Sequence, residues 1–248
     1  MGVVERVIRY PVKSLAGEEL ETGFVGFDGL VGDRVYAVVD VETGYALSAK
    51  KEARLLEVSV KLVDQTIELT FPDGTIYRRE DECNDALTRF LGRRVKLTKN
   101  SGQPLRYTGL EIDFEQNMRL YEKTGETRET RFHDSMPVHL LNLHSLPDYG
   151  LSGADFPRFR PNIVFSSDLS DEELVGRYVL LGEAVLKVVK PTKRCIVVTH
   201  QQQGLPKNLQ ILKNLRLIHG GKMGTYAVVV RPGTVAKHSP VEVYEDAP

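Results

Sequence analysis

The chain has 248 residues, with 33 lysines and arginines against 34 aspartates and glutamates, which leaves a formal net charge of −1. This length allows one large or two small domains, with a buried core that needs no disulfide support. The near-neutral charge argues against a broad surface for nucleic acid or acidic membranes, although it allows a local basic pocket.

Short strands separated by turns account for most of the first hundred residues. Residues 3–10 alternate with period two and end at a proline, as a strand would. Residues 56–63 and 66–71 flank a two-residue turn and predict a hairpin, and residues 85–91 predict a short helix that Gly92 ends. Further strands are expected over 35–41, 75–79 and 95–98. This pattern is typical of an antiparallel sheet or barrel with a minor helix.

The segment from 102 to 136 is polar, charged and aperiodic, and predicts a domain connection, a lid or partial disorder. After it, residues 139–146 are expected to begin a helix, and residues 208–218 to form one or two helical turns. Strands are expected over 163–165, 177–181, 184–189, 196–199, 226–230 and 241–244. The whole predicts a mainly β (α+β) protein with two β-rich domains joined near residue 110, and not a Rossmann fold.

Targeting and membrane signals are missing from the sequence. No basic segment followed by an apolar one opens the chain, and no apolar run approaches the roughly 20 residues that a membrane span needs. Two cysteines, Cys83 and Cys195, do not suggest a secreted disulfide framework. These features predict a cytoplasmic protein without a membrane span.

Several familiar functional motifs are also missing. The sequence contains no phosphate loop, GxGxxG, HExxH or paired CxxC motif. The histidines at 133, 139 and 144 have no recognised ligand spacing, so surface or core roles are expected for them. Two thiols cannot supply the four that an iron–sulfur cluster needs, which predicts that this chain holds none.

The two cysteines lie in opposite electrostatic settings. Cys195 follows Lys193 and Arg194, and adjacent cations favour the thiolate, the form that attacks carbon or binds a soft metal. A buried strand cysteine is the alternative for Cys195, about as strong on local grounds. Cys83 lies among acidic residues that oppose ionisation, so a structural role is expected for it.

Groups suited to binding anions gather at three strand ends. Lys13 and Ser14 follow the first strand, and Arg34 closes a glycine-rich turn, from which it can clamp a phosphate with two parallel hydrogen bonds. Arg160 and Asn162 flank a proline that keeps the chain extended, and the Asn162 amide offers both a donor and an acceptor to a heterocycle. Each cluster alone fits an ordinary turn; together with the Arg194–Cys195 pair they indicate a binding site.

These motifs resemble the MOSC-domain family, which includes the C-terminal domain of molybdenum cofactor sulfurases and the mitochondrial amidoxime reducing component with its bacterial relatives. The motifs occur in the expected order: YPVKS at 10–14, GLVGDR at 29–34, RFRPNIV at 158–164, KRC at 193–195 and GTYAVVVRPGTV at 224–235. The resemblance implies an N-terminal β-barrel module over 1–100, a connecting or lid segment over 101–136, and a MOSC β-barrel domain over 137–248.

The resemblance also implies a bound molybdenum cofactor, a pterin whose dithiolene sulfurs hold the metal. It implies that Cys195 is the catalytic thiolate on molybdenum. The residues that it implies for binding the phosphate and pterin are Lys13, Ser14, Arg34, Ser135, Arg160, Asn162, Arg194 and Tyr226.

Some positions depart from the family pattern. Lys193 stands where reducing-component relatives tend to carry serine, THQQQG follows the cysteine, and KHSP occupies 237–240. These differences leave the substrate class open. No appended ferredoxin domain or pyridoxal-phosphate domain is found, so the resemblance implies a separate electron-donor protein of the reductase, ferredoxin or cytochrome type.

Three functional hypotheses follow. The first is an oxidoreductase that reduces N-hydroxylated small molecules, such as amidoximes or hydroxylamines, at a cysteine-ligated molybdenum. The second is a non-redox cofactor or sulfur carrier that uses a Cys195 persulfide. The third sets the resemblance aside and pairs Cys195 with His200 for acyl transfer; it is the weakest, because residues five apart on one strand face opposite sides.

Overall fold

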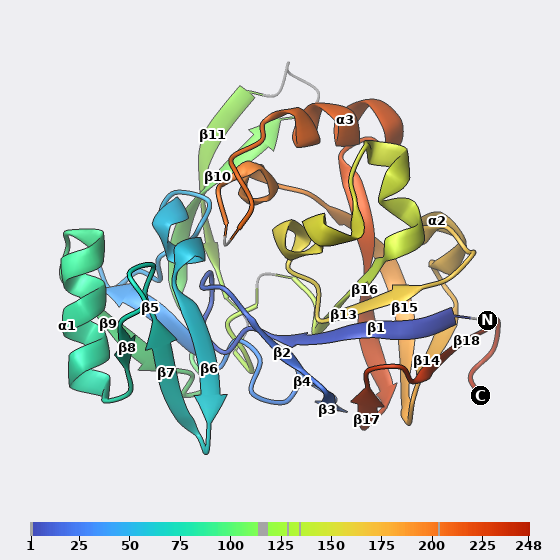
Figure 1. Cartoon of the computed structure of the whole chain (residues 1–248), viewed down its shortest axis with the longest axis horizontal. Helices are drawn as coiled ribbons and strands as arrows, with labels where there is room; N and C mark the ends of the chain where they lie inside the picture. The colour runs from blue at the N-terminus through green and yellow to red at the C-terminus, as the bar shows by residue number, and fades with distance from the viewer. Residues whose placement is uncertain (1, 114–118, 128, 134, 203) are drawn as a thin grey trace.

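The computed structural model describes residues 2–113, 119–127, 129–133, 135–202 and 204–248. The fold is mainly β with few short helices, as predicted (Figure 1). Its first strands are β1 (Gly2–Arg9), β2 (Glu18–Leu20), β3 (Thr22–Gly26), β4 (Gly29–Leu30), β5 (Tyr36–Asp40), β6 (Ser59–Val63), β7 (Thr66–Thr70), β8 (Ile76–Tyr77) and β9 (Val95–Lys99). The later strands are β10 (Arg106–Asp113), β11 (Arg119–Glu126), β12 (Val138–Asn142), β13 (Ile163–Ser166), β14 (Tyr178–Leu181), β15 (Ala184–Lys193), β16 (Lys222–Arg231), β17 (Gly233–Ala236) and β18 (Pro240–Tyr244).

The helices are few. The α-helices are α1 (Glu80–Leu91), α2 (Asp171–Leu174) and α3 (Gln210–His219), and 3₁₀ helices cover Ala53–Glu57, Leu143–Ser145, Pro147–Tyr149, Gly153–Phe159 and Ile196–Thr199. Searched over the described residues, the structure has no helix long and apolar enough to cross a membrane.

A closed barrel of seven strands forms the larger part of the molecule. Its strand order is β13-β12-β16-β15-β14-β18-β1, and pairing of β1 with β13 closes the ring. The pairs are antiparallel except for β12 with β13, which run parallel. Apolar side chains from every strand fill the interior, among them Val4, Leu140, Phe165, Leu186 and Ala227. Closure pairs the backbones of β1 and β13, which would otherwise be the edges of an open sheet, and it buries this core.

A second lobe carries its own core beside the barrel. There β6, β7 and β8 form one small sheet, β5 pairs with β9, and α1 packs against β9 (Figure 1). The helix buries Cys83, Ala86, Leu87 and Leu91, which share one face at helical spacing. Gly92 ends it in the left-handed conformation with φ 66°. The helix predicted over 85–91 is therefore present and begins earlier, at three acidic residues that suit a helix N-terminus.

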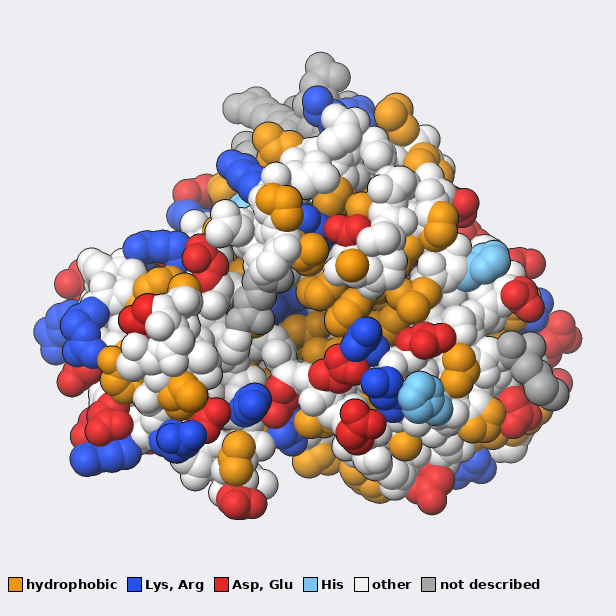
Figure 2. All heavy atoms as spheres, in the orientation of Figure 1, with side chains coloured by type: hydrophobic (Ala, Val, Ile, Leu, Met, Phe, Trp, Pro, Cys, Tyr) orange, Lys and Arg blue, Asp and Glu red, His pale blue; other side chains and the backbone are white. Residues whose placement is uncertain are grey.

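The two parts of the chain interlock. Strand β1 belongs to the first ten residues yet lies in the barrel between β18 and β13, and β17 from the end of the chain pairs with β3. On the face in Figure 2, acidic and basic side chains are interspersed, and hydrophobic side chains gather in a hollow near the middle. On this face the two signs of charge are mixed and form no broad basic patch.

Two predicted elements are wrong. The helix expected over 139–146 is strand β12 followed by a 3₁₀ turn; every residue of β12 is buried, so its apolar run carries no alternation that would distinguish strand from helix. The strand expected over 196–199 is a 3₁₀ helix. Its β-branched residues favour a strand, but Val198 packs into the core beneath α3, and this tertiary contact overrides the propensity.

The polar segment over 102–136 contains a regular hairpin. Strands β10 and β11 pair without a register shift from Arg106 opposite Glu126 to Asp113 opposite Arg119. Residues 114–118, 128 and 134, which also belong to the predicted segment, lie outside the described residues. A bridge between Ala46 and Tyr107 joins this hairpin to the second lobe.

Candidate functional site

One cavity brings together all nine residues predicted from the sequence. Its lining includes Cys195, Lys13, Ser14, Arg34, Ser135, Arg160, Asn162, Arg194 and Tyr226. They come from chain segments far apart: the end of β1, the turn before β5, the chain before β12, the turn before β13, the end of β15, and β16. The fold thus converts scattered strand-end motifs into a single site.

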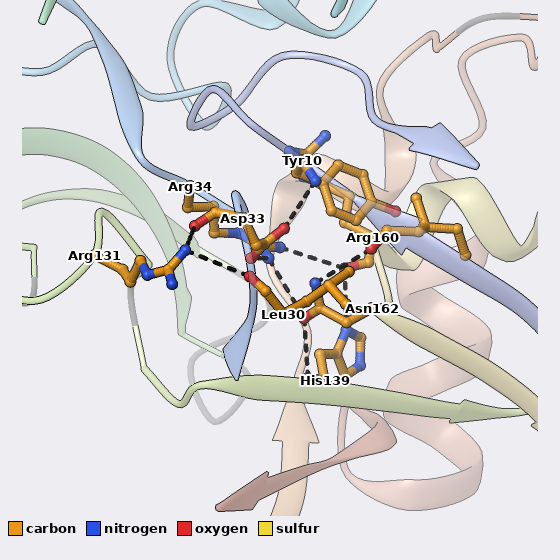
Figure 3. A network of polar contacts seen from close by, with 9 residues as sticks. Tyr10, Leu30, Asp33, Arg34, Arg131, His139, Arg160 and Asn162 are labelled. Carbon is orange, nitrogen blue, oxygen red and sulfur yellow. Dashed lines mark hydrogen bonds and ion pairs between the residues drawn. The ribbon is translucent and has the colours of Figure 1, made fainter. Parts of the chain in front are cut away.

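Three hydrogen bonds fix the glycine-rich turn. Asp33 accepts a hydrogen bond from the backbone N–H of Tyr10 at 2.8 Å, and the Arg34 N–H donates to the Tyr10 carbonyl at 2.7 Å. Arg131 donates to the Asp33 carbonyl at 2.9 Å from outside the turn (Figure 3). Arg34 itself has a left-handed backbone, with φ 49°. The turn therefore holds the Arg34 side chain in place before any ligand arrives.

Two arginines share the ring of Tyr10. The Arg34 guanidinium lies 4.9 Å from the ring centroid, and the Arg160 guanidinium lies 4.4 Å from it. Arg34 also pairs with the Asp33 carboxylate. Burial raises the pKa of Tyr10 to about 12, so its hydroxyl stays protonated at neutral pH. The ring's negative face stabilises two guanidinium groups that would otherwise repel each other.

Asn162 connects the barrel to this arginine cluster. Its side-chain oxygen accepts from the His139 N–H at 3.2 Å and from Arg34 at 3.4 Å, and its side-chain nitrogen donates to the Ile8 carbonyl at 3.4 Å. Asn162 is 1% exposed. These contacts tie β1, β12 and Arg34 together (Figure 3). A contact of Asn162 with a pterin stays a prediction.

His139 is a residue of this site that sequence reasoning missed. Its Nδ1 lies 3.3 Å from the Arg160 carbonyl, and its Nε2 lies 3.2 Å from Arg194 Nη1. A carbonyl only accepts and a guanidinium only donates, so the proton is on Nδ1 and the ring is neutral. Burial, together with the charges of Arg194 and Arg34, lowers the pKa of His139 well below its usual value. Only strand register, which places His139 opposite Tyr226, reveals this role.

Arg194 is a buried residue of the cavity lining. Its Nη2 donates to the Phe159 carbonyl at 2.7 Å, and burial lowers the pKa of its guanidinium. Among the described residues, its Nε has no hydrogen-bond partner, and the same holds for the hydroxyls of Thr192 and Thr225. Buried donors of this kind are costly unless something satisfies them. Arg194 and Thr192 both line the cavity.

Cys195 follows the end of β15 and precedes the 3₁₀ helix at Ile196. Its backbone is extended, with φ −123° and ψ 179°, and its thiol is free and half-buried. It lines the cavity, whereas His200 is not among the described residues that do so. The region is a 3₁₀ helix and not the strand on which the argument against acyl transfer relied. Among the described residues, the buried His200 Nε2 has no hydrogen-bond partner, so this nitrogen does not accept from the Cys195 thiol.

Cys83 contrasts with Cys195 at every point. It lies in the core of the second lobe, and burial together with the charges of Glu82 and Asp81 raises its pKa to about 11. A thiol in such a setting stays protonated and unreactive. Its surroundings agree with the structural role expected for it.

The fold and the site together define a class of protein: a closed β-barrel whose cavity contains a thiol and several cationic side chains. The chain matches the family model described as "MOSC domain" over residues 127–242 and the one described as "MOSC N-terminal beta barrel domain" over residues 1–102. The chain therefore belongs to the MOSC-domain family.

Similar proteins fall into two kinds. Mitochondrial amidoxime reducing component 2 of Rattus norvegicus is 26% identical over 80% of this chain and 67% of its own length. Mitochondrial amidoxime-reducing component 1 of Homo sapiens is 26% identical over 97% of this chain and 82% of its own length. Molybdenum cofactor sulfurase of Drosophila grimshawi is 25% identical over 86% of this chain, but the match spans only 30% of that protein. The family thus relates to the molybdenum cofactor.

A solved structure supports the fold over the whole chain. The YUAD protein from Bacillus subtilis matches with a TM-score of 0.52 and covers 100% of this chain and 98% of its own, at 12% sequence identity. Identity this low carries the likeness of fold alone. The match includes both family segments within one solved chain.

Proposed function

We propose that the protein is a molybdenum-cofactor-dependent oxidoreductase that reduces N-hydroxylated small molecules, with Cys195 as the thiolate ligand of the metal. The observation that supports this most is the shared cavity: Cys195 and the eight residues implied for cofactor binding all line it. The relatives named for amidoxime reduction support the reaction class.

The chemistry of the cavity fits such a cofactor. A free thiol lies in the same cavity as Lys13, Arg34, Arg160 and Arg194. A thiolate suits a soft metal site, and guanidinium groups suit a phosphate. The buried Arg194 Nε and Thr192 hydroxyl, which have no partner among the described residues, are donors that a polar ligand would satisfy.

Each residue then has a defined part. Arg34, Lys13 and Ser14 would hold the phosphate side. The Ser14 oxygen accepts from the Ala49 N–H at 3.0 Å, and a hydroxyl can donate its own proton at the same time. Arg160 and Tyr226 would contact the pterin. The Tyr226 ring is held against His139, with 5.4 Å between the two ring centroids. When bound, the cofactor would supply the redox-active metal centre for the reduction.

The protein's own contribution is to orient charge. The neutral His139 accepts from Arg194 and thereby fixes the guanidinium without adding a second positive charge. The Tyr10 ring holds the guanidinium groups of Arg34 and Arg160 against it. We propose that electrons come from a separate donor protein of the reductase, ferredoxin or cytochrome type; a cytoplasmic location stays a prediction.

The test removes one thiol at a time. Protein made in a cofactor-competent host should contain close to one molybdenum per chain and reduce benzamidoxime with methyl viologen as donor. Cys195→Ala should lose this activity at least about a hundredfold, because it lacks the metal's thiolate. Cys83→Ala, the matched control, removes a thiol far from the cavity and should retain both metal and rate.

The sulfur-carrier hypothesis gives a different result in the same preparations. Well-folded protein without molybdenum or pterin, in which mass spectrometry finds a persulfide on Cys195 after treatment with a cysteine desulfurase, would replace the oxidoreductase by a carrier. Full amidoxime reduction by Cys195→Ala with cofactor bound would also contradict the proposal.

A further inference from the structure

A second cavity adjoins the first at Cys195 and extends to the β10–β11 hairpin. Its volume is about 400 Å³. It adjoins the cavity that holds the predicted cofactor residues and adds Tyr107, Lys123 and Lys190 to the lining. The residues that line both cavities are Lys50, Ser135, Lys193, Arg194, Cys195 and Tyr226. A small molecule in this second cavity would therefore reach Cys195 from the hairpin side, next to the cavity that holds the predicted cofactor residues.

The charge of this second cavity is strongly positive. Glu111 is the one carboxylate among the described lining residues, and it is paired with Lys50. Three further lysines line the cavity with exposed side chains: Lys123, Lys190 and Lys193. In a protein of net charge −1, this concentration of cations is local. Cavities lined by one sign of charge raise the local concentration of the opposite ion.

Irregular strand pairing brings two of these lysines to the same side. Lys190 and Lys193 are three residues apart, and regular alternation would place them on opposite faces of β15. The pairing of β15 with β16 shifts register between Val188 and Lys190 and again between Pro191 and Lys193. Bulges of this kind re-aim side chains next to functional sites.

Aromatic groups and glycines shape the walls. Tyr107 and Tyr226 both line the cavity. A Cβ on Gly125 would come within 2.9 Å of the Tyr107 ring, and one on Gly109 within 2.8 Å of the Lys50 side chain. Glycine at these two hairpin positions lets Tyr107 and Lys50 pack closely against the backbone of the hairpin. The result is a pocket with aromatic walls and a positive rim, suited to a planar anion.

We infer that this second cavity is the substrate site and that it selects N-hydroxylated molecules bearing a carboxylate, which Lys123, Lys190 and Lys193 attract. This inference rests on the proposed function. A concave site of this volume with tyrosine walls fits a small molecule, whereas docking of an acidic donor protein would need a broader, flatter patch.

The first measurement compares three amidoximes that differ only in a para substituent. With methyl viologen as donor, kcat/KM for 4-carboxybenzamidoxime should exceed that for benzamidoxime about tenfold, and a trimethylammonium derivative should be the poorest substrate. The Lys123→Gln, Lys190→Gln double variant should lower the carboxylate preference about fivefold. Lys187→Gln removes one lysine charge from β15 outside the cavity and should leave the preference unchanged.

The preference also has a readout that needs no turnover. Calorimetric titration with benzoate and benzamide should show tighter binding of benzoate than of benzamide. This difference should be smaller in the double variant and unchanged in Lys187→Gln.

Equal kcat/KM for all three amidoximes, or a preference for the cation, would overturn the inference and leave the proposed function intact. Benzoate selectivity without amidoxime reduction would reject the proposed reaction and retain the anion site. Loss of rate in the double variant only with an acidic protein donor would assign these lysines to donor docking instead.

Discussion

At the scale of single residues, the site depends on a buried histidine that must stay neutral. His139 accepts from Arg194 and donates to the Arg160 carbonyl, so a second proton would have no acceptor and would face two nearby guanidinium groups. Burial and the charges of Arg194 and Arg34 lower its pKa for that reason. The same groups that prepare the cavity for an anion therefore make the folded protein sensitive to acid.

His139 gives the protein a pH dependence whose sign is defined. Below about pH 6.5 the unfolded chain binds a proton at this histidine that the folded chain does not, so stability falls as pH falls through that value. Replacing His139 by Gln removes the effect. Between pH 7.5 and 5.5, the free energy of unfolding of the wild type should fall more than that of His139→Gln, by up to about 1.4 kcal/mol.

Urea unfolding of cofactor-free protein at the two pH values measures this difference. The control is His144→Gln, which removes an exposed imidazole and should follow the wild type. Parallel losses in wild type and His139→Gln would show that the imidazole is protonated in the folded state, contrary to the hydrogen-bond geometry.

At the scale of elements, a glycine sets how closely β16 approaches β12. Gly224 has φ +73°, and a Cβ there would lie 2.7 Å from His139 Nε2 and 2.7 Å from the Leu140 carbonyl oxygen. Gly92, at the end of α1, has a similar φ of +66° but nothing within 4 Å of such a Cβ. The two positions share a backbone conformation and differ in their surroundings.

Alanine at each position should separate strain from contact. Gly92→Ala should cost about 1 kcal/mol for the left-handed backbone alone. Gly224→Ala should cost about 3 kcal/mol, because the carbonyl of a barrel strand cannot move aside as a flexible side chain can. Urea unfolding measures both losses, from the shift of the midpoint at an unchanged dependence of the unfolding free energy on urea. Equal losses would mean that β12 and β16 shift apart freely, and the contact would then have no energetic weight.

The sequence anticipates elements whose pattern is local and misses those fixed by packing. Period-two alternation identifies β1, and helical spacing with Gly92 identifies α1. Strand β12 has no alternation because the barrel buries both its faces, and the turn after Cys195 is set by a core that the local sequence does not describe. The site divides in the same way. The motif at a strand end predicts that Arg34 belongs to the site. No motif marks His139, whose position in the cavity follows only from the register of β12 against β16.

At the scale of the whole molecule, the chain's two family segments do not separate cleanly in space. Strand β1, from the first segment, pairs with β13 and β18 of the second, and its Val4 and Val7 are fully buried. Without β1 the barrel would open between β13 and β18 and expose two strand edges beside its core. Lys13 and Ser14 follow β1 directly, so the pairing that closes the barrel also carries these two residues to the cavity.

A fragment of residues 137–248 should therefore fail to fold alone, although it contains Cys195 and most of the barrel. We expect no cooperative thermal transition by circular dichroism and little protection from hydrogen exchange, because Val4 and Val7 no longer fill the core. Adding residues 1–100 in trans should restore the transition, whereas residues 21–100, which lack β1, should not. A fragment that melts cooperatively without β1 would show that the barrel closes by another pairing, and the link between closure and the cavity would then be lost.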